Sequence, residues 1–352
     1  MPRRICALSH LIALLALLTA APALEAQTQD VTLAAAGAQI HLTYPGAEFA
    51  DGGSALREWV QRSAAIVAAY YGQFPVRELT LRISAQSGDG VQGGQTFADP
   101  DALIRVRVGR SVTAGQLSAD WVLVHEMTHL ALPDVGESHA WLSEGLAVYV
   151  EGVARVQAGN RTEEDMWAEE LHAMPRGLPQ ADDRGLDHTH TWARTYWGGA
   201  MFCLLADVTI RQRTHNARGL QDALRAILRA SGGLAADWPI ERVLRTGDAA
   251  VGVDALETLY FRYKDAPLAP DLTGLWHSLG VTPTGTGVQL DESAPLAAVR
   301  RAILAPPPHS GAKVPVSAAV TRRMPSTRRY SMRTERRNPT SAAAGADMSP
   351  GV

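Results

Sequence analysis

Residues 125–129 read HEMTH, and residues 141–145 read WLSEG. If the first stretch is helical, His125 and His129 lie one turn apart on one face, so both imidazoles reach a single ion. Glu126 is then about 100° around the helix, where its carboxylate can accept a proton from a zinc-bound water. Glu144, on a second helix, supplies a third ligand and leaves the fourth position open, as in catalytic zinc sites. Together the two stretches predict a zinc hydrolase that binds one Zn²⁺.

The flanks of the first motif are typical of a buried helix. Residues 121–124 (WVLV) and 130–132 (LAL) are apolar, and Pro133 is expected to end the helix. Ser118 is the expected N-cap. A chain that keeps this fold and binds zinc without cleaving anything is the alternative, because a fold does not guarantee an activity.

Other side chains compete for roles at this centre. Asp134, just past Pro133, is the alternative third ligand. The metzincin spacing is excluded, because Leu132 and Val135 occupy the positions that require Gly and His. Glu151 is either a hydrogen-bond acceptor for a zinc-binding histidine or an exposed charge. The remaining candidates, as ligands or as residues lining the site, are Glu137, His139, His188 and His190.

The first 26 residues predict a secretory signal peptide. A positively charged start precedes an apolar run over residues 8–21, and cleavage is expected after Ala23 or Ala26. The run is too short to be favoured as a membrane span, and an uncleaved anchor is the alternative. We therefore expect an exported protein, periplasmic or secreted, with no integral membrane segment after cleavage. Cys203 would then be the only cysteine, and its apolar surroundings predict a buried small hydrophobe.

Charge divides the chain into a body and a tail. The formal net charge is −3 over 352 residues, which argues against a nucleic-acid surface on the body. Residues 305–352 carry eight Lys and Arg against two acidic residues and are rich in Pro, Ser, Thr and Ala. This composition predicts a disordered basic tail. A weak contact with an anionic surface is one interpretation of the tail, and a solvated extension without function is the simpler one.

Residues 27–304 predict an α+β peptidase domain with a zinc cleft between two parts. Residues 27–116 are expected to form a small mixed sheet with one helix, and residues 117–304 a mainly helical part. Short strands are expected at 31–33, 39–42 and 79–83, a turn at 87–94, and a half-exposed strand near a sheet edge at 104–108. Helices are expected at 54–71, capped by Ser54, and at 140–158, 162–173, 192–214, 219–230, 253–263 and 294–304.

The chain resembles the gluzincin zinc peptidases. HEMTH followed by WLSEGLAVY looks like the peptidase MA-like group, and residues 195–200 (TYWGGA) before a long helix are similar to a Tyr-x-Lys-Gly motif of the glycyl aminopeptidase family. Gly198 stands where that motif has Lys. The sequence also lacks a Gly-x-Met-Glu-Asn segment, the aminopeptidase motif whose Glu holds a substrate α-amine.

The resemblance implies a thermolysin-like gluzincin fold and a role for each motif residue. His125, His129 and Glu144 would be the zinc ligands, Glu126 the general base, and Tyr196 the hydroxyl that stabilises the oxyanion. The implied partner is a peptide or protein substrate, with no nucleic acid. The 104–108 strand is expected to pair with an extended substrate. A non-catalytic zinc-binding envelope protein that binds peptides in the same cleft is the alternative.

Overall fold

The computed structural model describes residues 28–98 and 100–306. The expected signal peptide and all but the first two residues of the expected tail lie outside these ranges. No described helix is long and apolar enough to cross a membrane.

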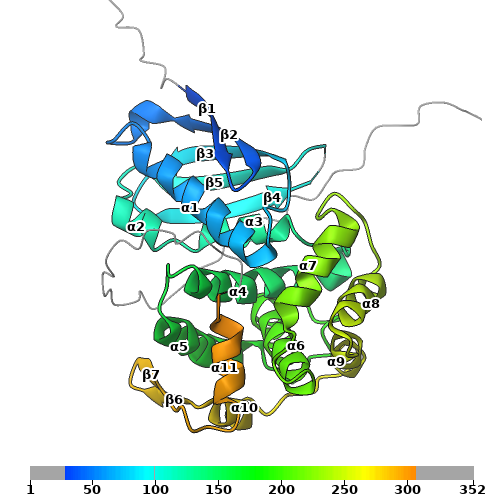
Figure 1. Cartoon of the computed structure of the whole chain (residues 1–352). Coiled ribbons are helices and arrows are strands. Elements are labelled where there is room, and N and C mark those ends of the chain that lie inside the picture. Colours follow the sequence, from blue (N-terminus) through cyan, green and yellow to red (C-terminus); the bar gives the residue numbers. More distant parts are fainter. Residues whose placement is uncertain (1–27, 99, 307–352) are drawn as a thin grey trace, which may run out of the picture. The chain divides into compact units, whose positions relative to one another are not determined.

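A five-stranded mixed sheet forms the N-terminal part (Figure 1). Its strands are Thr28–Ala35 (β1), Ala38–Pro45 (β2), Glu78–Gln86 (β3), Val91–Phe97 (β4) and Leu103–Gly109 (β5). They are ordered β1-β2-β3-β5-β4, with β2-β3 and β3-β5 parallel and the other pairs antiparallel. Parallel pairing of β2 and β3 requires a crossover, and the helix α1 (Ser54–Tyr71) provides it. Its apolar side chains, Trp59 and Val60 among them, are buried.

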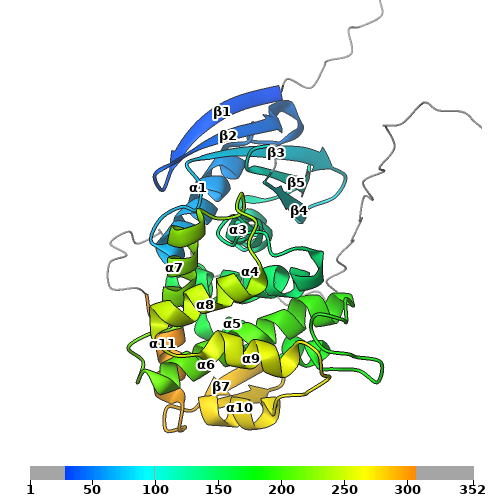
Figure 2. The ribbon, with the colours of Figure 1, turned by 90° about the vertical axis from the view of Figure 1, so that its right-hand side faces the viewer.

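The rest of the described chain is mainly helical. Its helices are Ala114–Ser118 (α2), Val122–His129 (α3), Ala140–Gln157 (α4), Glu163–Ala173 (α5), Gly199–Arg213 (α6), Leu220–Ser231 (α7), Ile240–Val251 (α8), Ala255–Tyr263 (α9), Leu272–Leu279 (α10) and Ala297–Leu304 (α11). In both ribbon views α3 lies between β4 and α4, and it packs against each of them (Figure 2). The structure thus confirms an α+β chain with an N-terminal mixed sheet followed by a helical part.

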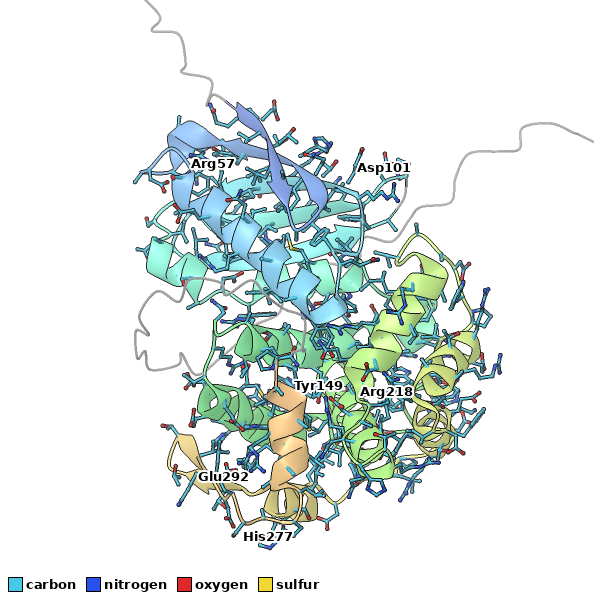
Figure 3. All side chains as sticks on the ribbon, in the orientation of Figure 1. Arg57, Asp101, Tyr149, Arg218, His277 and Glu292 are labelled. Atoms are coloured by element: carbon cyan, nitrogen blue, oxygen red, sulfur yellow. The ribbon has the colours of Figure 1, made fainter. Side chains whose placement is uncertain are left out.

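The core of the helical part contains a buried polar group. The Tyr149 hydroxyl donates to Asp207 Oδ2 at 2.9 Å, and Arg211 Nε donates to Asp207 Oδ1 at 2.8 Å. Figure 3 shows Tyr149 among these helices, whereas His277 and Glu292 are exposed at their margin. The hydrogen-bonded Asp207 carboxylate on α6 therefore ties α4 to α6.

The one cysteine among the described residues also lies in this core. Cys203 on α6 is buried, as predicted, and burial raises the pKa of its thiol.

Two helix starts differ from expectation. The helix α1 begins at Ser54, but its N-cap is Gly53, and the Asp51 carboxylate accepts the N–H groups of Gly53 and Ala55. Ser118 ends α2 instead of capping α3, and the Asp120 carboxylate accepts the N–H of Leu123 at 3.1 Å. In both places an aspartate a few residues away satisfies the free N–H groups, which a hydroxyl was expected to do.

The sheet edge is also different from expectation. The segment predicted as a turn at 87–94 contains the start of β4, which has a bulge between Val91 and Gly93. The strand at 104–108, expected near a sheet edge, is next to that edge: it lies between β3 and β4, and β4 is the edge strand. Alternation of apolar and basic residues indicates that one face of the strand is exposed. It does not indicate which strand lies at the edge of the sheet.

The part expected to be mainly helical also contains a hairpin, and three helices of the chain were missed. Val281–Thr284 (β6) and Gly287–Leu290 (β7) form a two-stranded antiparallel hairpin. The helices α2, α8 and α10 were not predicted. The expected helix 192–214 is interrupted, because Arg194–Gly198 forms a π-helical turn before α6.

Candidate metal centre

Two histidines of α3 face the same point. The ring nitrogens His125 Nε2 and His129 Nε2 lie 3.3 Å apart, as the spacing of four residues in a helix predicts. The His125 residue is only 3 % exposed. Its ring meets the Trp121 ring edge-on at 5.6 Å and stacks on the Tyr196 ring at 6.3 Å with an interplanar angle of 8°. Aromatic packing therefore fixes the orientation of His125.

Glu144 joins the two histidines from α4. Its Oε2 lies 3.3 Å from His125 Nε2 and 3.6 Å from His129 Nε2. A tetrahedral zinc ion with ligand bonds of roughly 2.0–2.2 Å needs ligand atoms about 3.3–3.6 Å apart. The three side chains therefore fit the spacing that such an ion requires. Among the described residues they form the one group of three or more His, Cys, Asp or Glu side chains close enough to share an ion.

Glu144 and the two histidines affect each other's pKa. Burial disfavours the charge of Glu144, but His129 and His125 outweigh that effect and hold its pKa well below the usual range. Burial likewise opposes the charge of His129, while Glu144 and Glu126 raise its pKa. The Glu144 carboxylate is thus ionised, which is the state that a carboxylate ligand of a metal must have.

Ser143 supports one of the histidines. Its Oγ lies 3.0 Å from His129 Nδ1, the ring nitrogen on the far side from Glu144. A partner on that nitrogen fixes the ring orientation and the tautomer of a metal-binding histidine. Sequence reasoning missed Ser143, although it precedes Glu144 within the quoted motif.

Glu126 lies on α3 and faces β4. It is 7 % exposed, and the hydroxyl Oγ1 of Thr96 lies 2.7 Å from Glu126 Oε2 and 2.9 Å from the Glu126 carbonyl oxygen. A Cβ added to Gly94 would lie 2.5 Å from Glu126 Cγ. Sequence reasoning missed both β4 residues, since they are about thirty residues earlier and carry no metal-site signal.

Tyr196 belongs to the π-helical turn that precedes α6. Its ring stacks on His125 and also on Trp192, at 5.5 Å. Two glycines allow the close packing of this segment on α4, because a Cβ on Gly145 would lie 2.1 Å from the backbone of Gly199. The glycine of WLSEG therefore has a packing role, and π-helical turns are frequent at functional sites.

The competing candidates lie elsewhere. Asp134 is exposed and accepts the N–H of Gly136, and it is not part of the three-residue group. Glu151 is neither exposed nor the acceptor for a histidine, because it is buried and pairs with Arg155 Nη1 at 3.4 Å. Buried acids are held by such partners, and the sequence spacing did not show this one.

The other four candidate residues from the sequence also lie outside the three-residue group. Glu137 and His190 are exposed. His139 Nδ1 lies 2.9 Å from the Val135 carbonyl, and His188 pairs with Asp265 at 2.9 Å. None of the four belongs to the group formed by His125, His129 and Glu144 among the described residues.

Comparison with known proteins bears on the fold. No protein-family model matches the sequence, and no curated protein matches it. An aminopeptidase N family protein from Idiomarina loihiensis is similar in structure, with a TM-score of 0.55 and 16% identity over 72% of this chain and 49% of that chain. An M1 zinc metallopeptidase from Deinococcus radiodurans gives a TM-score of 0.47 and 16% identity over 69% of this chain and 53% of that chain in its complex with a Tyr-Ser-Ala substrate. A further structure of an M1 zinc metallopeptidase from that organism gives a TM-score of 0.45 and 18% identity over 69% and 52%.

The chain thus spans about half the length of the solved structures that it matches. At 16% identity, the likeness to the Idiomarina protein shows a common fold and no more. The gluzincin assignment stays a prediction. The peptidase MA-like group and the glycyl aminopeptidase family stay predictions.

Proposed function

We propose that this chain is an exported, zinc-dependent metallopeptidase. The observation that carries the proposal is that His125 and His129, on the helix that also carries Glu126, lie within 3.3 to 3.6 Å of each other and of Glu144 on α4. Two imidazoles and one carboxylate are a donor set typical of catalytic zinc, which keeps an open fourth position. The common fold with an aminopeptidase N family protein adds support.

In the proposed reaction His125, His129 and Glu144 hold the ion. Zinc in such a site polarises water and the substrate carbonyl, so that hydrolysis proceeds at neutral pH. The Glu126 carboxylate accepts the proton of the attacking water and then delivers it to the leaving amine. Glu126 is suited to this role because it is mostly buried on the ligand-bearing helix.

Tyr196 is the proposed donor to the developing oxyanion. Its ring stacks on the ring of the ligand His125, which keeps the side chain beside the centre. A hydroxyl in this role acts when charge develops on the carbonyl oxygen, so it contributes to the rate of the chemical step.

The proposed substrate is an extended peptide or protein chain. We first expected the 104–108 strand to pair with it, but β4 is the outermost strand and packs against α3. An outermost strand offers unpaired backbone groups to a peptide, so β4 takes over this role in the proposal. We also propose that the zinc site lies in a cleft between the sheet and the helices. The proposal of export depends on residues 1–26, which predict a signal peptide. The proposal of a weak contact with an anionic surface depends on the basic tail at 305–352.

The test uses the purified protein and a library of fluorogenic peptides. We expect cleavage that a chelator abolishes and added zinc restores. Glu126→Gln should keep about one zinc per chain and lose on the order of 10²–10⁴ in turnover, because an amide cannot accept the proton. Cleavage by Glu126→Gln at the wild-type rate would refute the base. Zinc binding without cleavage of any peptide would favour the non-catalytic alternative.

A further inference from the structure

We propose that β4 positions the general base, with Thr96 as the positioning residue and Gly94 as the residue that makes room for it. This inference rests on the proposed function, in which Glu126 is the base. It concerns two residues that neither the zinc motif nor the ligand geometry involves.

Thr96 contacts Glu126 at two atoms. Its Oγ1 lies 2.7 Å from Oε2 of the carboxylate and 2.9 Å from the backbone carbonyl oxygen of the same residue. A hydroxyl has one proton to donate, so the two oxygens share it. The contact therefore ties the carboxylate to the helix backbone that carries it, and it leaves Oε1 for the attacking water.

Gly94 allows this arrangement. A Cβ at this position would lie 2.5 Å from Cγ, 2.8 Å from Oε1 and 2.9 Å from Cδ of Glu126. Such distances are shorter than van der Waals contact allows, so any other residue would displace the carboxylate or the strand. The requirement is for space, because Gly94 does not have a positive φ.

The sheet makes β4 a rigid support. Thr96 pairs with Ile104 and Gly94 pairs with Val106, both buried residues of β5. Residues two apart in a strand face the same side, and these two face α3. A glutamate has three rotatable side-chain bonds, and a base must stay within hydrogen-bond reach of the proton that it accepts. A fixed donor on a paired strand reduces this freedom more than a donor on a loop would.

The first experiment compares three single variants. Thr96→Val removes the hydroxyl and keeps the shape, Thr96→Ser keeps the hydroxyl, and Thr43→Val is the matched control. The Thr43 hydroxyl donates to the Asp30 carboxylate at 2.7 Å on the same sheet, and neither residue takes part in the proposed site. We expect Thr96→Val to lose about 10- to 100-fold in kcat with KM and zinc content little changed. Thr96→Ser should retain most of kcat, and Thr43→Val should match the wild type.

Three results would overturn the proposal. One is a wild-type kcat in Thr96→Val, and another is an equal loss in Thr43→Val. Loss of zinc from Thr96→Val would show that the hydroxyl supports the metal centre and not the base. A wild-type protein that cleaves nothing would refute the proposed function itself and, with it, any catalytic role for Thr96.

A second measurement tests the contact without any activity. Thermal unfolding of Thr96→Val, Glu126→Leu and the double variant forms a double-mutant cycle. We expect the double variant to lose less stability than the two single losses combined, since each single change breaks the same contact. Additive losses would show that Thr96 does not hold Glu126.

Discussion

The two sides of the metal centre are built in different ways. On the ligand side, His125, His129 and Glu144 come from two consecutive helices and lie within nineteen residues of chain. On the base side, Glu126 is held by Thr96, thirty residues earlier and in the sheet. Because the two sides use different supports, a variant can lose metal binding without a direct effect on Glu126, or impair proton transfer by Glu126 without loss of the metal. The variants below test this separation and the parts that both sides share.

The largest effect is expected from the ligand side. Glu144→Ala should lose most of the zinc and with it nearly all turnover, because two imidazoles alone bind zinc weakly. Asp134→Ala is the matched control and should keep both, since Asp134 is exposed and outside the three-residue group. Metal analysis after zinc loading and gel filtration gives the answer. Zinc lost from Asp134→Ala and kept by Glu144→Ala would move the third ligand to Asp134.

Tyr196→Phe should come next. It keeps the ring that stacks on His125 and Trp192 and removes the hydroxyl alone. Loss of one oxyanion donor typically costs on the order of 10²–10³ in rate, and the loss should appear in kcat. Steady-state kinetics with zinc content measured in parallel tests this. Full activity in the variant would leave Tyr196 as a packing residue and pass the oxyanion role to another donor.

Ser143→Ala should have a smaller effect, confined to the ligand side. Removing the Oγ that lies 3.0 Å from His129 Nδ1 should weaken zinc binding by about 10- to 100-fold. Once the protein is saturated with zinc, kcat should be close to that of the wild type. Competition with a zinc-sensing chelator measures the affinity. An unchanged affinity together with a reduced kcat would mean that Ser143 acts on the base side.

The smallest effect is expected for Asp120, just before α3. This helix carries both candidate histidine ligands and Glu126. Burial of its carboxyl group raises the pKa of Asp120 from 3.8 to about 6, against the opposing effect of Leu123 N–H and Arg155. A raised pKa in the folded state means that this contribution to stability is complete below about pH 4 and is lost as pH rises through 6.

Asp120→Asn keeps an acceptor for Leu123 and Trp59 but does not ionise. The stability of the wild type relative to this variant should therefore fall by roughly 1 to 3 kcal/mol between pH 4 and pH 7.5. Urea unfolding of both proteins at the two pH values measures the difference. A difference that stays constant with pH would mean that Asp120 titrates normally.

Much of the ligand side could be predicted from the sequence, because its geometry is local. The spacing of four residues in a helix places His125 beside His129 wherever that helix lies. A short connection brings α4 back against α3, so Glu144 was a reasonable third candidate. The α+β order of elements followed from hydrophobic periodicity in the same way. The ligand roles themselves stay predictions until metal binding is measured.

The Glu126 base was predicted from its motif, but its support on β4 could not be, because that support depends on a contact between distant segments. Gly93 and Gly94 made the start of β4 look like a turn. Only the pairing of this segment with β5 makes it an edge strand of the sheet. The alternating pattern of 104–108 showed a half-exposed strand without its place in the sheet. Strand order and register depend on the free energy of packing the whole sheet, and one strand's sequence carries only part of it.

The sequence by itself therefore determined the helices that carry the two motifs and the chemistry that their side chains could offer. Periodicity and the HEMTH and WLSEG motifs act within a few turns of chain, so a local pattern is enough to read them. Only the tertiary structure decided that Thr96 and Gly94 meet Glu126, that Ser143 meets His129, and that Gly145 meets Gly199. These are contacts between separate elements, and long-range packing, not local propensity, selects which elements meet.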